Sequence, residues 1–128
     1  MNRRAFVFAS LAASAGVFPA RAQADVQVIY IGGQDCPPCR RWRSTYHARW
    51  LASAEFQKVA WFEIEPMRLR EAYEERNWPR ALRPVLAQVA RKSGTPRFLI
   101  VKDGEIVFND IGVGKWDTMM ATLKRLMG

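Results

Sequence analysis

Apolar positions in the first half of residues 25–128 form two kinds of pattern, one typical of buried strands and one typical of a helix. Val26–Ile31 is apolar at nearly every position, which predicts a buried central strand, and the run stops at Gly32-Gly33. Residues 37 to about 54 carry apolar side chains every three or four positions, which predicts a helix with one buried face. Residues 59–64 predict a second strand. This order favours parallel strands joined by a right-handed crossover.

The stretch from residue 67 to residue 93 has a helical tendency that prolines interrupt. Pro79 and Pro84 divide it and predict helices over residues 68 to about 76 and 85–92. Gly94 is the expected C-terminal cap of the second of these helices.

The last third of the chain predicts a hairpin and a helix. Asp103-Gly104 is a typical two-residue turn between two apolar runs, Arg97–Lys102 and Glu105–Ile111, so two antiparallel strands are expected. An apolar stripe along Trp116–Met127 predicts a helix that packs on the sheet. We therefore predict the α/β class, with a central mixed sheet of about four strands flanked by helices.

Residues 1–24 have a different composition and predict a cleavable signal peptide. Arg3 and Arg4 precede an uncharged apolar stretch over residues 5–18, and small residues follow at Ala22 and Ala24, where cleavage is expected. The double arginine is similar to a twin-arginine signal, and general secretion stays open as the other route. We expect export to the bacterial periplasm of one domain, residues 25–128, with no membrane anchor after cleavage.

The charge balance argues against a nucleic-acid partner. The full chain has 20 basic and 12 acidic residues, and loss of residues 1–24 removes three of the basic ones, which leaves 17 and a net charge of +5. Acidic and basic residues alternate along the charged stretches, as on a solvated helix face, and no basic stripe is formed. We expect a monomer that acts on proteins and does not bind nucleic acid.

The two cysteines of the chain, Cys36 and Cys39, carry the predicted chemistry. They lie between a strand and a helix, with Pro37 and Pro38 between them in the first turn, where missing N–H groups cost little. A helix N-terminus favours a thiolate, so Cys36 is the expected nucleophile, and the deeper Cys39 would resolve the mixed disulfide. Apart from this redox-active disulfide, no cofactor and no metal are expected.

The order of motifs resembles the thioredoxin family over nearly all of the mature chain. The resemblance rests on the strand, Cys36-Pro37-Pro38-Cys39 and helix, followed by Gly94-Thr95-Pro96, the hairpin and the final helix. It implies thiol–disulfide exchange with protein thiols or disulfides and a partner that recycles the site. It also implies a cis peptide bond before Pro96, against the cysteine pair, and substrate contacts at Thr95, Pro96, Pro37 and Pro38.

Two departures from the thioredoxin pattern affect this expectation. The family's buried Asp on the first strand is replaced by Tyr30, so a proton relay must use water or another group. The cysteines and Pro96 are also farther apart than in the minimal fold, which predicts a helical insertion before the cis-proline, within residues 66–83. Trp78 in this insertion is either an exposed aromatic for partners or a residue that packs locally.

The direction of electron flow is predicted to be reducing or isomerase-like. Pro37 and Pro38 remove two N–H donors from the Cys36 thiolate, and no His lies between the cysteines, so extreme thiolate stabilisation is not expected. The alternative function is a periplasmic copper-handling protein, because two thiolates can hold the soft ion Cu(I). A closed zinc site is disfavoured, since His47 and two cysteines do not supply four ligands.

Overall fold

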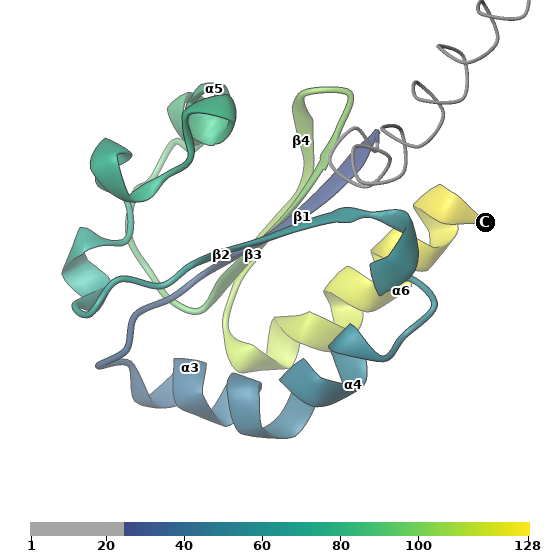
Figure 1. Ribbon diagram of the computed structural model, residues 1–128, viewed down its shortest axis with the longest axis horizontal. Coiled ribbons are helices and arrows are strands. Elements are labelled where there is room, and N and C mark those ends of the chain that lie inside the picture. Colours follow the sequence, from purple (N-terminus) through teal and green to yellow (C-terminus); the bar gives the residue numbers. More distant parts are fainter. Residues whose placement is uncertain (1–24) are drawn as a thin grey trace, which may run out of the picture.

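Four strands make one mixed sheet at the centre of the molecule (Figure 1). The computed structural model describes residues 25–128. The predicted signal peptide, residues 1–24, lies outside the described residues. The strands are β1 (Val26–Ile31), β2 (Ala60–Ile64), β3 (Arg97–Lys102) and β4 (Glu105–Ile111), in the order β2-β1-β3-β4. β1 is parallel to β2 and antiparallel to β3, and β3 is antiparallel to β4, so the predicted mixed sheet is confirmed.

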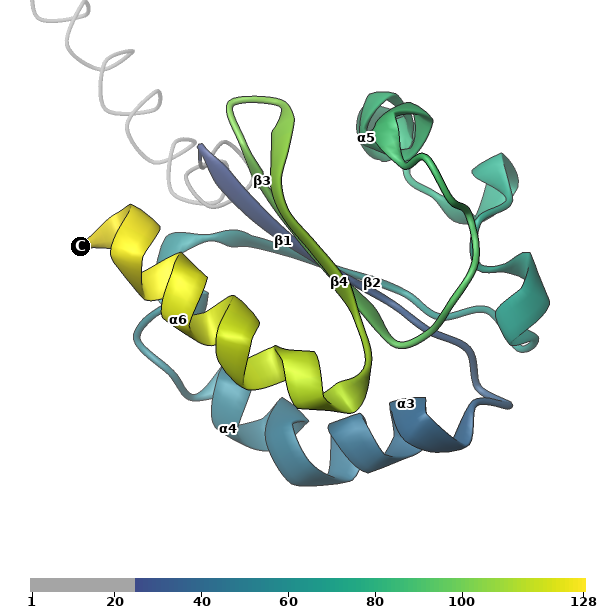
Figure 2. The ribbon, with the colours of Figure 1, turned by 180° about the vertical axis from the view of Figure 1, so that it is seen from behind.

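One face of the sheet is covered by the helical segment that follows the cysteines and by the C-terminal helix (Figure 2). The first segment consists of α3 (Pro37–Trp42), a π-helical turn (Arg43–His47) and α4 (Ala48–Leu51), and the second is α6 (Trp116–Met127). Aromatic rings fill the space between them and the sheet. Trp42 stacks on Tyr30 of β1, with ring centroids 4.4 Å apart, and meets Trp116 of α6 edge-on at 5.2 Å. The apolar face predicted for residues 37 to about 54 is therefore part of the core.

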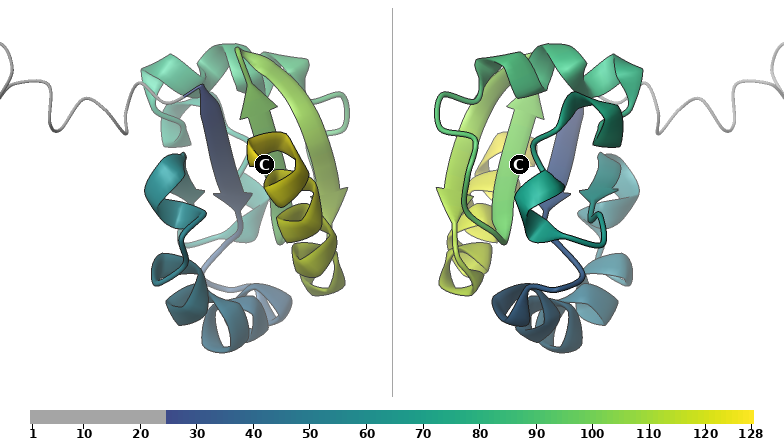
Figure 3. Two further views of the ribbon diagram at one scale, coloured as in Figure 1. Left: turned by 90° about the vertical axis from the view of Figure 1, so that its right-hand side faces the viewer. Right: turned by 90° about the vertical axis from the view of Figure 1, so that its left-hand side faces the viewer.

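The opposite face is covered by short helical turns and by α5 (Arg83–Gln88), as the edge-on views show (Figure 3). The three 3-10 turns are Leu69–Glu71, Glu75–Asn77 and Arg80–Leu82. Trp78 is 2% exposed and packs in the core of this face with Leu82 and Val85. Two further 3-10 turns, Phe56–Lys58 and Val113–Lys115, precede β2 and α6.

The insertion departs from the predicted helices in two ways. No continuous α-helix forms over residues 68–76; 3-10 turns take its place and let Trp78 donate its indole N–H to the carbonyl of Ala72 (2.8 Å), inside the core. The expectation that Trp78 is an exposed aromatic is therefore wrong, and the local-packing alternative is correct. The helix predicted over residues 85–92 is α5, which ends earlier since Val89 adopts an extended conformation and is fully buried.

The strand register brings three segments that are distant in the sequence to the same end of the sheet, where β1 and β2 finish and β3 begins. Ile31, the last residue of β1, pairs with Ile64, the last residue of β2, and with Arg97, the first residue of β3. The segments that start at residues 32 and 65, and the one that ends at residue 96, must therefore meet there. The candidate site lies at this end of the sheet.

Candidate active site

Cys36 and Cys39 form a disulfide at the start of α3, with their Cα atoms 5.2 Å apart. Cys36 is the N-cap residue of the helix: its backbone is extended, and its sulfur accepts the backbone N–H of Cys39 at 3.2 Å. The chain enters the helix here because Pro37 and Pro38 occupy its first turn, where their fixed φ suits the helix and their missing N–H groups have no intrahelical acceptor. The geometry places the Cys36 sulfur at the amino end of a helical run.

The segment before β3 reaches the same sulfur from the other side. The Thr95–Pro96 peptide bond is cis, and the Thr95 hydroxyl lies 3.3 Å from Cys36 Sγ. Because a disulfide sulfur carries no hydrogen, the hydroxyl is the donor in this contact. The two segments that the sequence pointed to, the cysteine pair and Thr95-Pro96, are thus in direct contact. Pro37 is exposed and Pro38 half-buried at the same place.

Both cysteines are equally buried, each 1% exposed, whereas we expected Cys39 to be the more buried of the two. Thr95 covers the Cys36 sulfur, and the insertion packs on the loop that leads into Cys36. Arg40 does not face the sulfur, since its guanidinium donates to the Gln34 carbonyl at 2.9 Å. The donors at Cys36 Sγ are therefore one backbone N–H and one hydroxyl.

The insertion is hydrogen-bonded to both loops of the site. On the cysteine side, the Gln34 N–H donates to the Pro66 carbonyl (2.9 Å) and the Leu69 N–H to the Asp35 carboxylate (2.7 Å). On the proline side, the Tyr73 hydroxyl donates to the Gly94 carbonyl at 2.6 Å. The insertion thus bridges the two halves of the site.

A buried arginine supports the loop that carries the cis peptide bond. Arg97 is 5% exposed, and its guanidinium donates to Asn109 Oδ1 at 2.8 Å, to the Ser93 carbonyl at 3.2 Å and to the Arg91 carbonyl. It also lies over the Tyr73 ring, 5.6 Å from its centroid. These hydrogen bonds connect the turn over residues 91–94, which leads to Thr95, to Asn109 of β4.

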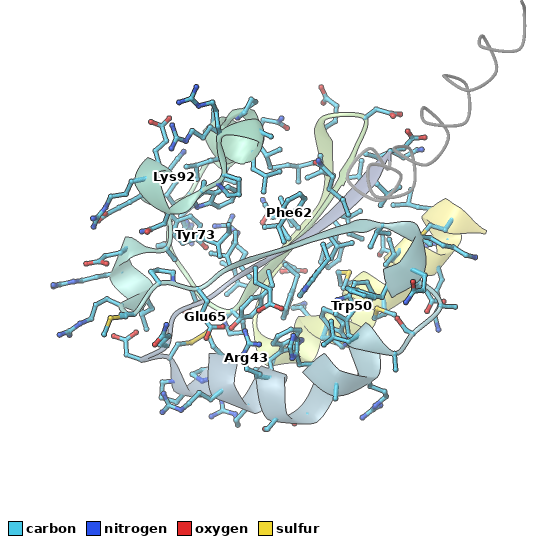
Figure 4. All side chains as sticks on the ribbon, in the orientation of Figure 1. Arg43, Trp50, Phe62, Glu65, Tyr73 and Lys92 are labelled. Atoms are coloured by element: carbon cyan, nitrogen blue, oxygen red, sulfur yellow. A yellow bond between two sulfur atoms is a disulfide. The ribbon has the colours of Figure 1, made fainter. Side chains whose placement is uncertain are left out.

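A charged cluster lies behind the cysteines, between the π-helical turn and β2. Arg43 donates to the carboxylates of Glu63 (2.9 Å) and Glu65, and His47 contacts Glu63 at 2.9 Å; Figure 4 shows Arg43 and Glu65 facing one another. Partial burial alone would raise the pKa of Glu63, but hydrogen bonds from Arg43, His47 and Trp61 outweigh it and hold the pKa below its usual value. Glu63 is therefore an anion at neutral pH.

Searches with protein-family models and against curated proteins gave no match. Solved structures do match. The periplasmic thioredoxin SoxS from Paracoccus pantotrophus is 17% identical, with a TM-score of 0.56 over 80% of this chain and 96% of that one. Spinach chloroplast thioredoxin f is 16% identical (TM-score 0.56; 85% and 83% covered), and Fasciola hepatica thioredoxin 20% (TM-score 0.52; 89% and 92% covered). The chain has a thioredoxin-like fold.

Several residues of this candidate site were not found from the sequence. Asp35, Tyr73 and Arg97 connect the insertion and the two loops, and none of them stands in a motif or a periodic pattern that would mark it. His47 is half-buried beside Glu63, whose carboxylate it contacts.

Neither a metal cluster nor a membrane helix is found in residues 25–128. Within this part of the chain, no three His, Cys, Asp or Glu side chains are grouped so that they could hold a metal ion. None of the helices in the same part has the length and apolar character that a membrane span needs.

Proposed function

We propose that the chain is a thiol:disulfide oxidoreductase that exchanges disulfides with protein clients through Cys36 and Cys39. The observation that carries the proposal is the contact between the Cys36–Cys39 disulfide, at the head of a helix, and the loop with the cis Thr95–Pro96 bond. A cysteine pair one helical turn apart can open and close without rearrangement of the backbone, as a redox-active pair must. The closed loop is too short to make stabilisation of the fold a strong alternative reason for the disulfide.

The reaction proceeds by two successive exchanges. In the reducing direction, the Cys36 thiolate attacks one sulfur of a client disulfide, and the other client sulfur leaves as a thiolate. Cys39 then loses its proton, and its thiolate attacks Cys36 Sγ; the Cys36–Cys39 bond forms, the bond to the client breaks, and the client sulfur leaves with the electron pair. Over the two steps the client disulfide is reduced, because it gains the two electrons that the cysteine pair loses on forming its disulfide.

The site residues divide into two roles. The Thr95 hydroxyl and the Cys39 N–H donate to Cys36 Sγ, which would favour the thiolate that attacks. Thr95 and Pro96 offer the backbone beside which a client chain would lie, and Pro37 and Pro38 form the adjoining apolar surface in front of the disulfide. Clients are proteins with accessible thiols or disulfides, and a separate redox partner restores the cysteine pair after each turnover.

We further infer a reducing or isomerase-like direction. Two donors at Cys36 Sγ, with Pro37 and Pro38 unable to add more and Arg40 bound to a carbonyl, support only moderate stabilisation of the thiolate. Strong oxidants of this chemistry depend on a highly stabilised thiolate. The expected reduction potential is therefore below roughly −150 mV. Equilibration with glutathione or dithiothreitol buffers measures it, and a value near −120 mV would contradict the proposed direction.

The proposed location is the periplasm, reached with the signal peptide over residues 1–24. The apolar stretch behind Arg3 and Arg4 supports export, and the fold is similar to that of a periplasmic thioredoxin, SoxS. Cell fractionation with an epitope at the C-terminus, together with N-terminal sequencing, tests this location. Recovery of an uncleaved chain from the cytoplasm would contradict it.

Trapping tests the proposed exchange directly. In Cys39→Ser, attack by Cys36 still occurs, but the mixed disulfide is no longer resolved, so clients should accumulate as adducts that reductant releases. The matched control is Cys36→Ser, which keeps the other thiol. Adducts with Cys39→Ser and none with Cys36→Ser are expected. Equal capture by both variants, or capture by neither, would refute the assigned roles.

A further inference from the structure

Tyr30 has a buried hydroxyl that the proposed exchange does not yet use. The residue is 0% exposed at the last but one position of β1, and within residues 25–128 its hydroxyl makes no hydrogen bond of standard geometry, although Glu65 and Arg43 lie close enough to change its pKa. The indole nitrogens of Trp42 and Trp50 share this property, but Tyr30 alone of the three carries a group that can both give and accept a proton. A buried polar group without a well-formed hydrogen bond destabilises a fold, and a catalytic or redox role is one reason for a protein to retain it.

The hydroxyl lies beside the sulfur of Cys39. A Cβ atom at residue 32 would be 2.3 Å from Tyr30 Oη and 3.0 Å from Cys39 Sγ, so the two atoms border one small space that the glycine leaves open. The Tyr30 ring is held in this position by Trp42, which stacks on it at 4.4 Å, and by Phe98 of β3 at 6.1 Å. The packed ring therefore keeps its hydroxyl on the side of Gly32 that Cys39 Sγ also borders.

On its other side, Tyr30 meets the charged cluster that reaches solvent. The charged groups that face it are Glu65, after β2, and Arg43, whose guanidinium lies 5.5 Å from the ring centroid, whereas β3 and Trp42 present only rings. The Glu65 side chain is 22% exposed, so a proton placed there can leave to water. Burial, and then Glu65, raise the pKa of Tyr30 while Arg43 lowers it; the net rise keeps the phenol neutral.

We propose that the Tyr30 hydroxyl relays the Cys39 proton to the Glu65 carboxylate when Cys39 resolves the mixed disulfide. The Cys39 proton passes to Tyr30 Oη as the phenolic proton passes to a carboxylate oxygen of Glu65, so the phenol ends as it began. The Cys39 thiolate then attacks Cys36 Sγ, and the client sulfur leaves with the electron pair. Glu65 returns its proton to solvent. This inference rests on the proposed exchange and adds the route of its proton.

The test separates formation of the mixed disulfide from its resolution. Reduced protein is mixed with a symmetric, disulfide-linked dimer of a fluorescent peptide, quenched with acid at successive times, and the mixed disulfide is measured by mass spectrometry. The variants are Tyr30→Phe, which keeps the ring and its stacking, Glu65→Gln, and the double variant. Tyr46→Phe is the matched control, because it removes a tyrosine hydroxyl from the π-helical turn, where Tyr46 packs on Trp116 and lines a pocket that does not include either cysteine.

Each outcome decides between the relay and its alternatives. With the relay, all variants form the mixed disulfide at the wild-type rate, and Tyr30→Phe resolves it on the order of 100-fold more slowly at pH 6–7. The deficit in the rate of resolution shrinks as the pH rises, because hydroxide then removes the Cys39 proton directly. In the double variant, Glu65→Gln adds little to the effect of Tyr30→Phe, because both residues act on one path. Wild-type resolution by Tyr30→Phe, or a deficit that is constant with pH, overturns the relay. Failure of the wild type to form any mixed disulfide instead overturns the proposed exchange.

Discussion

Replacement of Gly33 by alanine should detach the insertion from the cysteine loop. A Cβ atom at this position would lie 2.4 Å from Leu69 Cα and 2.6 Å from Leu69 N. These are backbone atoms, so no side-chain rotation relieves the clash, and the segment around Leu69 must move. That movement breaks the hydrogen bond from the Leu69 N–H to Asp35, now 2.7 Å long.

The structure gives the size of this effect. Forcing a methyl group into a packed site destabilises a protein by about 1–3 kcal/mol. Loss of the Leu69–Asp35 hydrogen bond, whose acceptor is charged but exposed to solvent, adds up to about 1 kcal/mol. We therefore expect Gly33→Ala to lower the free energy of unfolding by about 2–4 kcal/mol, which for a domain of this size shifts the midpoint of thermal unfolding down by on the order of 10 °C.

Urea and thermal unfolding measure this loss, and the rate of disulfide reduction by dithiothreitol gives a second readout. Since the insertion packs on the loop that leads into Cys36, we expect the disulfide of Gly33→Ala to be reduced faster than that of the wild type. Gly114→Ala is the matched control, because a Cβ atom there would meet nothing within 4 Å. The reasoning is refuted if the two variants unfold at the same temperature.

Three further substitutions test other parts of the site. Thr95→Val removes the hydroxyl donor at Cys36 Sγ, so alkylation of Cys36 by iodoacetamide at pH 7 should slow about tenfold, and an unchanged rate would contradict the assigned donor. Tyr73→Phe leaves the Gly94 carbonyl without its 2.6 Å donor and should cost about 1–2 kcal/mol in urea unfolding; an unchanged midpoint would show that the hydroxyl adds nothing. Glu63→Gln tests the charged cluster by pH. Because the folded state holds the Glu63 pKa below 4.5, its stabilisation is present above that pH and is lost as the pH falls through the folded value. The wild type should be more stable than Glu63→Gln at pH 7, with a difference that shrinks as the pH falls below 4.5, and a constant difference would contradict this.

The sheet and the cysteine pair were predictable because their signals are local. Val26–Ile31 and the hairpin around Asp103-Gly104 have the residue types and spacing of strands, and α6 begins and ends at the residues that its apolar stripe indicates. The contact between Cys36 and Thr95 came from the resemblance to thioredoxins. The register that places β1 beside β3 explains it, but no pattern in the sequence alone fixes that register.

The insertion was predictable in position but not in conformation. Its extent follows from the long separation between Cys39 and Pro96. Its 3-10 turns depend on tertiary contacts: the Trp78 indole reaches the Ala72 carbonyl, and the Asn77 side chain reaches the Glu71 carbonyl. A helix over residues 68–76 would remove these partners, and helix propensity, at a few tenths of a kcal/mol per residue, is too weak to outweigh the burial of a tryptophan.

The two consecutive glycines after β1 show how one loop serves both chemistry and packing. Read as sequence, Gly32 and Gly33 mark only the end of a strand. In the structure each is required by a close approach on a different side: Gly32 leaves the space that Tyr30 Oη and Cys39 Sγ border, and Gly33 lets the backbone of Leu69 pack on the loop. A side chain at the first position would clash with the Tyr30 hydroxyl, and one at the second would displace the insertion. The loop that presents the disulfide is thus held between the proposed proton route and the segment that bridges the site.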